Sequence, residues 1–131
     1  MEIEHVTPLD PLDVAARMDE LKLLHAGWLD GNGQALDRAG LDRLTNAFTT
    51  HYPDNLPLPY TFPTESGNIQ FEWRLGSSAP EIEIDLATLK GEWVSDDEAS
   101  IELSTSEGWS DLASRILALV RANHRLGRGR Q

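Results

Sequence analysis

The sequence predicts an α+β fold with two N-terminal helices, an antiparallel β-meander of four or five strands, and a C-terminal helix packed on the apolar sheet face. Apolar residues recur at helical spacing near both ends of the 131-residue chain and alternate with polar residues in its middle part. The connections between the alternating segments are short, which favours antiparallel pairing with one solvated face. Residues 1–124 are therefore expected to form a single domain.

The first helix is expected from Pro11 to about Leu24. Its apolar positions, Val14, Met18 and Leu21, recur at helical spacing. Proline suits the first turn of a helix, because the amide hydrogen that it lacks has no helical partner there. The glycine-rich residues 27–33 then predict a turn.

The second helix is expected from about Asp37 to Thr50, with Asp37 as its N-cap. Leu41, Leu44 and Phe48 lie on one face of this helix. Four prolines follow between residues 52 and 63, and they predict an extended, polyproline-like path.

After the prolines the apolar period changes from that of a helix to that of a strand. Ile69, Phe71, Trp73 and Leu75 alternate with polar residues, and residues 81–86 alternate in the same way. Further strands are expected at about residues 91–95 and 100–104, separated by a turn at residues 96–98. A last helix is expected over residues 110–123, followed by a short, basic, flexible tail at residues 125–131.

Composition excludes several classes of protein. The chain has no cysteine, so it can hold neither a disulfide framework nor a thiolate metal site. Its apolar runs are too short to cross a bilayer, and its acidic N-terminus lacks a leader pattern, so a cytoplasmic protein that does not bind membranes is expected. None of the four histidines stands at a metal-ligand spacing, and no nucleophile or phosphate-loop signature is present. We therefore expect no catalytic residue, metal or cofactor, and no enzyme.

Residues 30–33, Asp-Gly-Asn-Gly, resemble part of a calcium-binding EF-hand loop. Placing Gly33 at the glycine position of the loop puts Trp28 at the first ligand position, and placing Asp30 first puts Leu41 where a bidentate acid is needed. Glycine and asparagine tolerate positive φ angles, so a tight turn is the better interpretation.

Acidic residues outnumber basic ones 22 to 11, giving a net charge of −11. Within the predicted sheet, Glu81, Glu83 and Asp85 alternate along one strand and point to one face. A solvated surface is the simplest interpretation. The functional interpretation is recognition of a basic protein partner, because the same charge disfavours direct binding of nucleic acid. The interface candidates are Glu72, Glu81, Glu83, Asp85, Tyr60 and Phe62.

The leading hypothesis is thus a small acidic protein-binding module of the antitoxin, immunity or adaptor kind. One alternative is a ligand-binding protein or enzyme with a pocket between helices and sheet, for which the candidates are Trp28, His51, Tyr60 and Trp73. Another is a structural homodimer that pairs through an exposed strand edge near Asp96 or Tyr60.

Three motifs carry a resemblance: GWLDG at residues 27–31, LPYTFPT at residues 58–64 and GNIQFEW at residues 67–73. In this order they resemble a set of small uncharacterised bacterial proteins, over roughly residues 27–75. The resemblance implies a bacterial, cytoplasmic, single-domain protein. It brings no activity, cofactor or catalytic residue.

Overall fold

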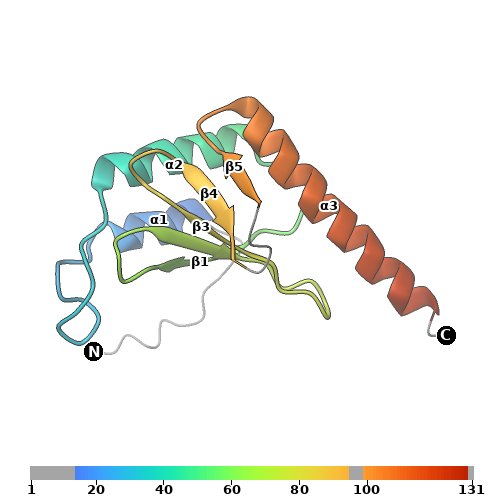
Figure 1. The fold of residues 1–131 in the computed structure, drawn as a ribbon, viewed down its shortest axis with the longest axis horizontal. Helices are drawn as coiled ribbons and strands as arrows, with labels where there is room; N and C mark the ends of the chain where they lie inside the picture. Colours follow the sequence, from blue (N-terminus) through green and yellow to red (C-terminus); the bar gives the residue numbers. More distant parts are fainter. Residues whose placement is uncertain (1–13, 95–98, 130–131) are drawn as a thin grey trace.

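A five-stranded antiparallel sheet with three helices forms the fold, as predicted (Figure 1). The computed structural model describes residues 14–94 and 99–129, with side chains up to Asn123. The elements are α1 (Val14–Leu21), α2 (Arg38–His51), β1 (Tyr60–Pro63), β2 (Ile69–Glu72), β3 (Glu81–Ile84), β4 (Lys90–Trp93), β5 (Ser100–Glu102) and α3 (Ser106–Gly129). The strands lie in the sheet in chain order, so the predicted meander is confirmed with five strands.

The helices α1 and α2 lie behind the sheet in Figure 1, and α3 crosses its β5 end. The predicted N-cap of α2 is confirmed, since Asp37 Oδ2 accepts a hydrogen bond from the Gly40 amide at 2.8 Å. The helix α1 ends at Leu21, three residues before the predicted end, and the predicted start at Pro11 lies outside the described residues.

The helix α3 is longer at both ends than the predicted range of residues 110–123. It begins at Ser106 because Thr105 caps it, with Thr105 Oγ1 accepting a hydrogen bond from the Gly108 amide at 3.0 Å. It extends to Gly129, so residues 125–129, expected in the basic tail, are helical. Arg130 and Gln131 lie outside the described residues.

Part of the proline-rich segment is a strand, which corrects the predicted polyproline-like path. Residues Tyr60–Pro63 pair with β2 as β1. This strand lies at the edge of the sheet, where a proline is tolerated because its missing amide hydrogen has no neighbouring strand to serve.

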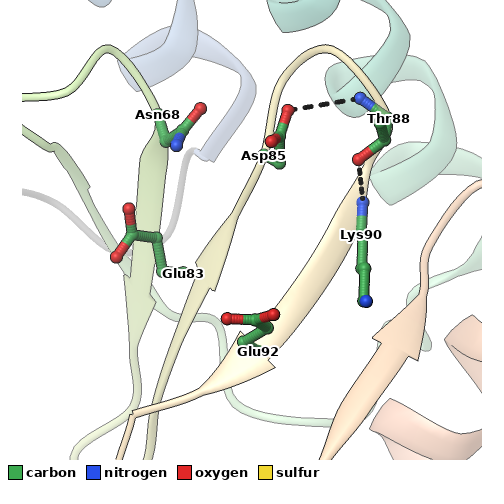
Figure 2. A pocket seen from close by; sticks show the side chains of 6 residues that line it. All are labelled: Asn68, Glu83, Asp85, Thr88, Lys90 and Glu92. Carbon is green, nitrogen blue, oxygen red and sulfur yellow. Dashed lines mark hydrogen bonds between the residues drawn. The ribbon is translucent and has the colours of Figure 1, made fainter.

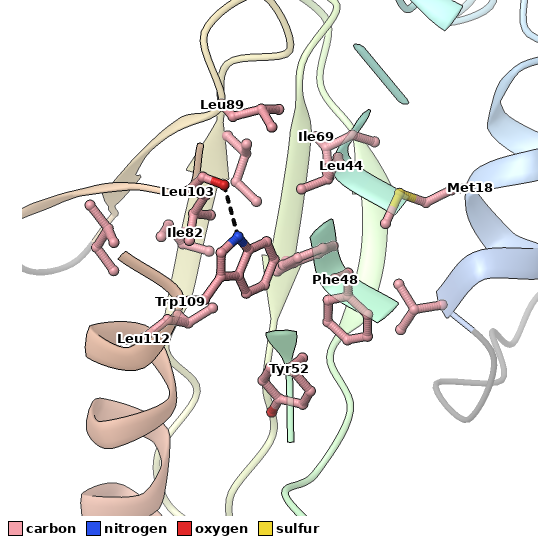
Figure 3. Packing of buried hydrophobic residues seen from close by; sticks show 14 of the residues in the cluster. Met18, Leu44, Phe48, Tyr52, Ile69, Ile82, Leu89, Leu103, Trp109 and Leu112 are labelled. Carbon is pink, nitrogen blue, oxygen red and sulfur yellow. Dashed lines mark hydrogen bonds between the residues drawn. The ribbon is translucent and has the colours of Figure 1, made fainter. Parts of the chain in front are cut away.

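Large apolar side chains fill the space between helices and sheet (Figure 3). The Phe48 ring on α2 is central: it stacks on Tyr52 with ring centroids 4.7 Å apart and meets Phe71 of β2 and Trp109 of α3 edge to face. The Trp109 indole donates a hydrogen bond to the Leu103 carbonyl at 2.8 Å, which satisfies its buried polar atom.

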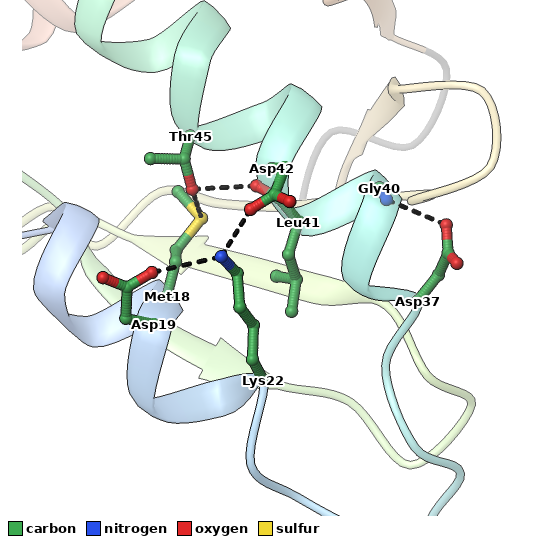
Figure 4. A network of polar contacts seen from close by, with 8 residues as sticks. All are labelled: Met18, Asp19, Lys22, Asp37, Gly40, Leu41, Asp42 and Thr45. Atoms are coloured by element: carbon green, nitrogen blue, oxygen red, sulfur yellow. Dashed lines mark hydrogen bonds and ion pairs between the residues drawn. The ribbon is translucent and has the colours of Figure 1, made fainter.

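The two N-terminal helices are joined by polar contacts as well as by packing (Figure 4). Lys22, just after α1, pairs with Asp42 of α2 and with Asp19 at 3.3 Å. Its hydrogen bonds to Asp42 and Asp19 raise the pKa of Lys22 above its ordinary value. Within the described residues, no helix is long and apolar enough to span a membrane.

Candidate functional site

The candidate site is the sheet face opposite the one on which the described helices pack, and we call it the outer face. Burial alternates along the strands: Ile69 and Phe71 of β2 are buried, whereas Gln70 and Glu72 are partly exposed, and β3 and β4 repeat this alternation. Its described strand residues are Tyr60, Phe62, Gln70, Glu72, Glu81, Glu83, Lys90, Glu92, Ser100 and Glu102. Glutamate is the commonest residue type among them.

The strand register places glutamates directly opposite one another on this face. Glu72 of β2 is aligned with Glu81 of β3, and Glu83 of β3 is aligned with Glu92 of β4. Directly opposed side chains of an antiparallel pair have Cβ atoms about 4.5–5.5 Å apart, so like charges there destabilise the sheet. The outer face therefore holds a concentrated negative charge that folding alone does not require.

A shallow cavity of about 200 Å³ opens on the outer face at the turn between β3 and β4 (Figure 2). It is lined by Asn68, Glu83, Asp85, Thr88, Lys90 and Glu92. Asp85 Oδ1 accepts hydrogen bonds from the amides of Ala87, at 2.7 Å, and Thr88, at 3.3 Å, which fixes its carboxylate in the turn. The lining carries three carboxylates, from Glu83, Asp85 and Glu92, and one ammonium group, from Lys90, so negative charge predominates in the cavity.

At the β1 end of the outer face two aromatic rings lie parallel. Tyr60 and Phe62 have ring centroids 6.5 Å apart and an interplanar angle of 7°. The Arg74 guanidinium lies over the Tyr60 ring, with Cζ 4.1 Å from the ring centroid. Arg74 Nη2 is also 3.4 Å from a carboxylate oxygen of Glu72. A cation, an aromatic face and a carboxylate thus already meet here.

The structure brings the six interface candidates to one face. Tyr60 and Phe62 lie on β1, opposite Glu72 and Gln70 of β2. Glu81 and Glu83 follow on β3, and Asp85 is exposed just beyond that strand. Sequence reasoning missed Glu92 and Glu102, although the alternation of Gly91 and Trp93 with polar residues could have shown which side chains of β4 point outward.

The four pocket candidates do not meet. Trp73 is fully buried in the core, where its indole donates hydrogen bonds to the Tyr52 hydroxyl at 3.0 Å and the Pro57 carbonyl at 3.2 Å. Tyr60 lies on the opposite face of the sheet, and exposed His51 stacks on Trp109 at the end of α2. Trp28 lies in the glycine-rich turn.

That turn is tight, as the sequence predicts. Asp30 and Gly31 have φ angles of 50° and 92°, and Leu29 and Asn32 exchange two backbone hydrogen bonds of 2.7 and 2.8 Å. Positive φ at both central residues is typical of a type I′ turn. The Trp28 indole donates to the Gln34 carbonyl at 2.8 Å. Across the described parts of the chain, no three acidic or histidine side chains are grouped as metal ligands.

A cavity of about 270 Å³ lies at the end of α2, on the helix side of the molecule. It is lined by Phe48, Thr49, Tyr52, Pro53, Asp54 and Leu58. Tyr52 is anchored beneath it, because its hydroxyl donates a hydrogen bond to the Pro57 carbonyl. Burial raises the pKa of Tyr52 to about 12. The raised pKa keeps the hydroxyl protonated, and therefore a hydrogen-bond donor to Pro57, to well above pH 10.

The two sheet edges are partly covered. On β1, the Thr61 carbonyl accepts a hydrogen bond from Arg17 Nε at 3.0 Å, and Pro63 has no amide hydrogen to offer a further strand. On β5, the first turn of α3 lies so close that a Cβ atom at Gly108 would be 1.9 Å from the Glu102 carbonyl oxygen. The other predicted edge, near Asp96, lies outside the described residues.

Comparison with family models, with curated proteins and with solved structures finds no match for this chain.

Proposed function

We propose that the protein is a binding module of the bacterial cytoplasm that holds a basic protein partner on the outer face of its sheet, in the manner of an antitoxin, immunity or adaptor protein. The observation that carries this proposal is the register of Glu72 with Glu81 and of Glu83 with Glu92. Like charges in these positions weaken the free protein, and a cationic partner relieves their repulsion. Binding of a cationic partner is therefore favoured by the loss of a repulsion that lowers the stability of the free protein.

Three further features support a protein partner. None of the three described helices covers the outer face, and a sheet surface of this kind can meet a partner over several strands at once. Its aromatic end, Tyr60 and Phe62, supplies the residue type that is enriched at protein interfaces. The carboxylates of the cavity near Asp85 suit a lysine or arginine side chain.

The test compares two variants that lose the same number of charges. The outer-face variant carries Glu81→Gln, Glu83→Gln and Glu92→Gln. The matched control carries Glu20→Gln, Asp54→Asn and Asp111→Asn, at exposed positions of the helical layer and the loop that follows α2. Each tagged protein is used to capture partners from lysate of the organism that encodes it, at low and at high salt.

A basic protein held by the wild type and by the control, absent from the outer-face variant and released at high salt, is the expected result. If the outer-face variant retains the same partner with the same salt dependence as the wild type, the proposal is overturned. Loss of the partner from both variants would also overturn it, because net charge alone would then explain the binding.

A further inference from the structure

We propose that the stacked rings of Tyr60 and Phe62 form a binding site for an arginine side chain of the partner, and that Arg74 occupies this site in the free protein. The inference rests on the proposed function, since it names the group that the outer face recognises. It also identifies Arg74 as an internal competitor for the same aromatic site.

The ring pair is arranged to receive a planar cation. Tyr60 and Phe62 are two residues apart on β1, so both project from the same face, and their ring planes are nearly parallel, with centroids 6.5 Å apart. A guanidinium group stacks on an aromatic ring through its flat face and keeps its edges available for hydrogen bonds. The Glu72 carboxylate, aligned with Tyr60 across the strands, accepts such bonds.

Arg74 shows that a guanidinium fits this site. Its Cζ lies 4.1 Å from the Tyr60 ring centroid, and Nη2 lies 3.4 Å from Glu72 Oε1. These are the two contacts, with ring face and carboxylate, that an arginine of a partner would make. The Arg74 guanidinium therefore occupies the position that we assign to the guanidinium of a partner arginine.

The contacts of Arg74 are weak enough to be exchanged. Its side chain is 55% exposed, and a salt bridge in that setting contributes little because water screens the charges. The ion pair also joins residues only two positions apart on one short strand end, and the N···O distance of 3.4 Å is long for a charge-assisted hydrogen bond. A partner arginine that brings further cations to Glu81 and Glu83 can displace it.

The test measures the preference for arginine over lysine, because long-range charge attraction treats both alike. The probes are nona-arginine and nona-lysine peptides, titrated into the full chain at low salt. Arg74→Ala vacates the ring, and Lys90→Ala is the matched control: it removes the same charge from the same face without a ring contact in the described structure. Tyr60→Leu in the Arg74→Ala background removes the aromatic surface.

We expect Arg74→Ala to raise the ratio of nona-arginine to nona-lysine affinity about two- to fivefold. Lys90→Ala should raise both affinities and leave that ratio at the wild-type value. Adding Tyr60→Leu to Arg74→Ala should abolish the gain. Circular dichroism of each variant checks that the fold is kept.

Two results overturn the proposal in different ways. If both peptides bind but Arg74→Ala and Lys90→Ala give the same ratio, Arg74 is not a competitor and the arginine site is refuted, whereas the proposed function stands. If neither peptide binds the wild type or Arg74→Ala, the acidic face does not recognise cations, and both proposals are refuted.

Discussion

The two faces of the sheet are built from the same strands and follow opposite rules. On the helix side, Phe71 and Trp73 are fully buried and meet edge to face, with ring centroids 5.9 Å apart. On the outer side, one position along the same strand, Glu72 is aligned with Glu81. The aromatic contact stabilises the fold, whereas the alignment of two like charges destabilises it.

The opposed glutamates indicate that stability alone does not account for the outer face. A solvated sheet face needs only polar side chains, and alternating lysine and glutamate would provide cross-strand attraction at no cost to solubility. Opposed glutamates are instead found twice, whereas Lys90 of β4, aligned with Glu102 of β5, forms an opposed pair of opposite charge. Arg74, just beyond the end of β2, lies next to Glu72. The side chains on the helix side form the core that stabilises the fold, and those on the outer side form the candidate binding surface.

The largest expected difference between the faces comes from adjacent positions of β2. Phe71→Ala removes a fully buried ring from the centre of the core and should lower the free energy of unfolding by about 3–5 kcal/mol. Gln70→Ala, on the outer face, should change it by less than about 0.5 kcal/mol. Urea unfolding followed by tryptophan fluorescence measures both. Equal losses would show that the outer face is packed against something, which would contradict the comparison.

A second prediction concerns the polar group that the core side buries. The Tyr52 hydroxyl is bonded to the Pro57 carbonyl, and burial raises its pKa from 10.0 to about 12. Above pH 10 the unfolded chain loses this proton while the folded chain keeps it, so stability is full below pH 10 and falls as the pH rises to 12. The loss should approach about 2–3 kcal/mol, since one pKa unit corresponds to about 1.4 kcal/mol.

The measurement uses Tyr60→Phe, which leaves Tyr52 as the remaining one of the two tyrosines. Its phenolate absorbance in the folded protein should appear near pH 12. Tyr52→Phe should remove this part of the pH dependence of unfolding. A phenolate signal near pH 10 in a protein that is still folded would contradict the buried hydrogen bond.

A third prediction tests how α3 closes the β5 edge. Alanine normally stabilises a helix relative to glycine, by about 1 kcal/mol. At Gly108 a Cβ atom would be 1.9 Å from the Glu102 carbonyl oxygen, so Gly108→Ala should instead destabilise the protein by about 1–3 kcal/mol. Ser110→Ala, at an exposed position of the same helix, is the control. If Gly108→Ala is as stable as Ser110→Ala, α3 does not lie against β5 as described.

The sequence was sufficient to predict the alternation and therefore the two faces. The two-residue period of a strand is enough to predict that Ile69 and Phe71 face the core and that Gln70 and Glu72 face outward. The segment from Tyr60 to Pro63 is predicted from the sequence as an extended path and not as a defined strand of the sheet, because prolines disfavour strands in general and the edge position that tolerates them is a property of the whole sheet.

The candidate site was predicted only in part for a similar reason. Periodicity puts Glu83 and Glu92 on a face, but it does not say that they are aligned, since register depends on the turns and on packing of the opposite face. The contact of Arg74 with Tyr60 joins a residue just beyond the end of β2 to a residue of β1, and it had no local signal. The four pocket candidates lie apart, since Trp73 is fully buried in the core and Tyr60 lies on the outer face.

The smallest expected effect is the one that decides what the outer face is for. Glu83→Gln removes one of two opposed charges without changing the shape of the side chain, so it should raise the free energy of unfolding by about 0.2–1 kcal/mol. The gain should shrink as salt is added, because screening weakens the repulsion with Glu92 in the wild type. Thermal unfolding at low and high salt measures both effects, and Glu65→Gln, at an exposed turn position, is the control. A stability loss on Glu83→Gln would mean that the carboxylate supports the fold, and the alignment of Glu83 with Glu92 would then no longer indicate recognition of a cationic partner.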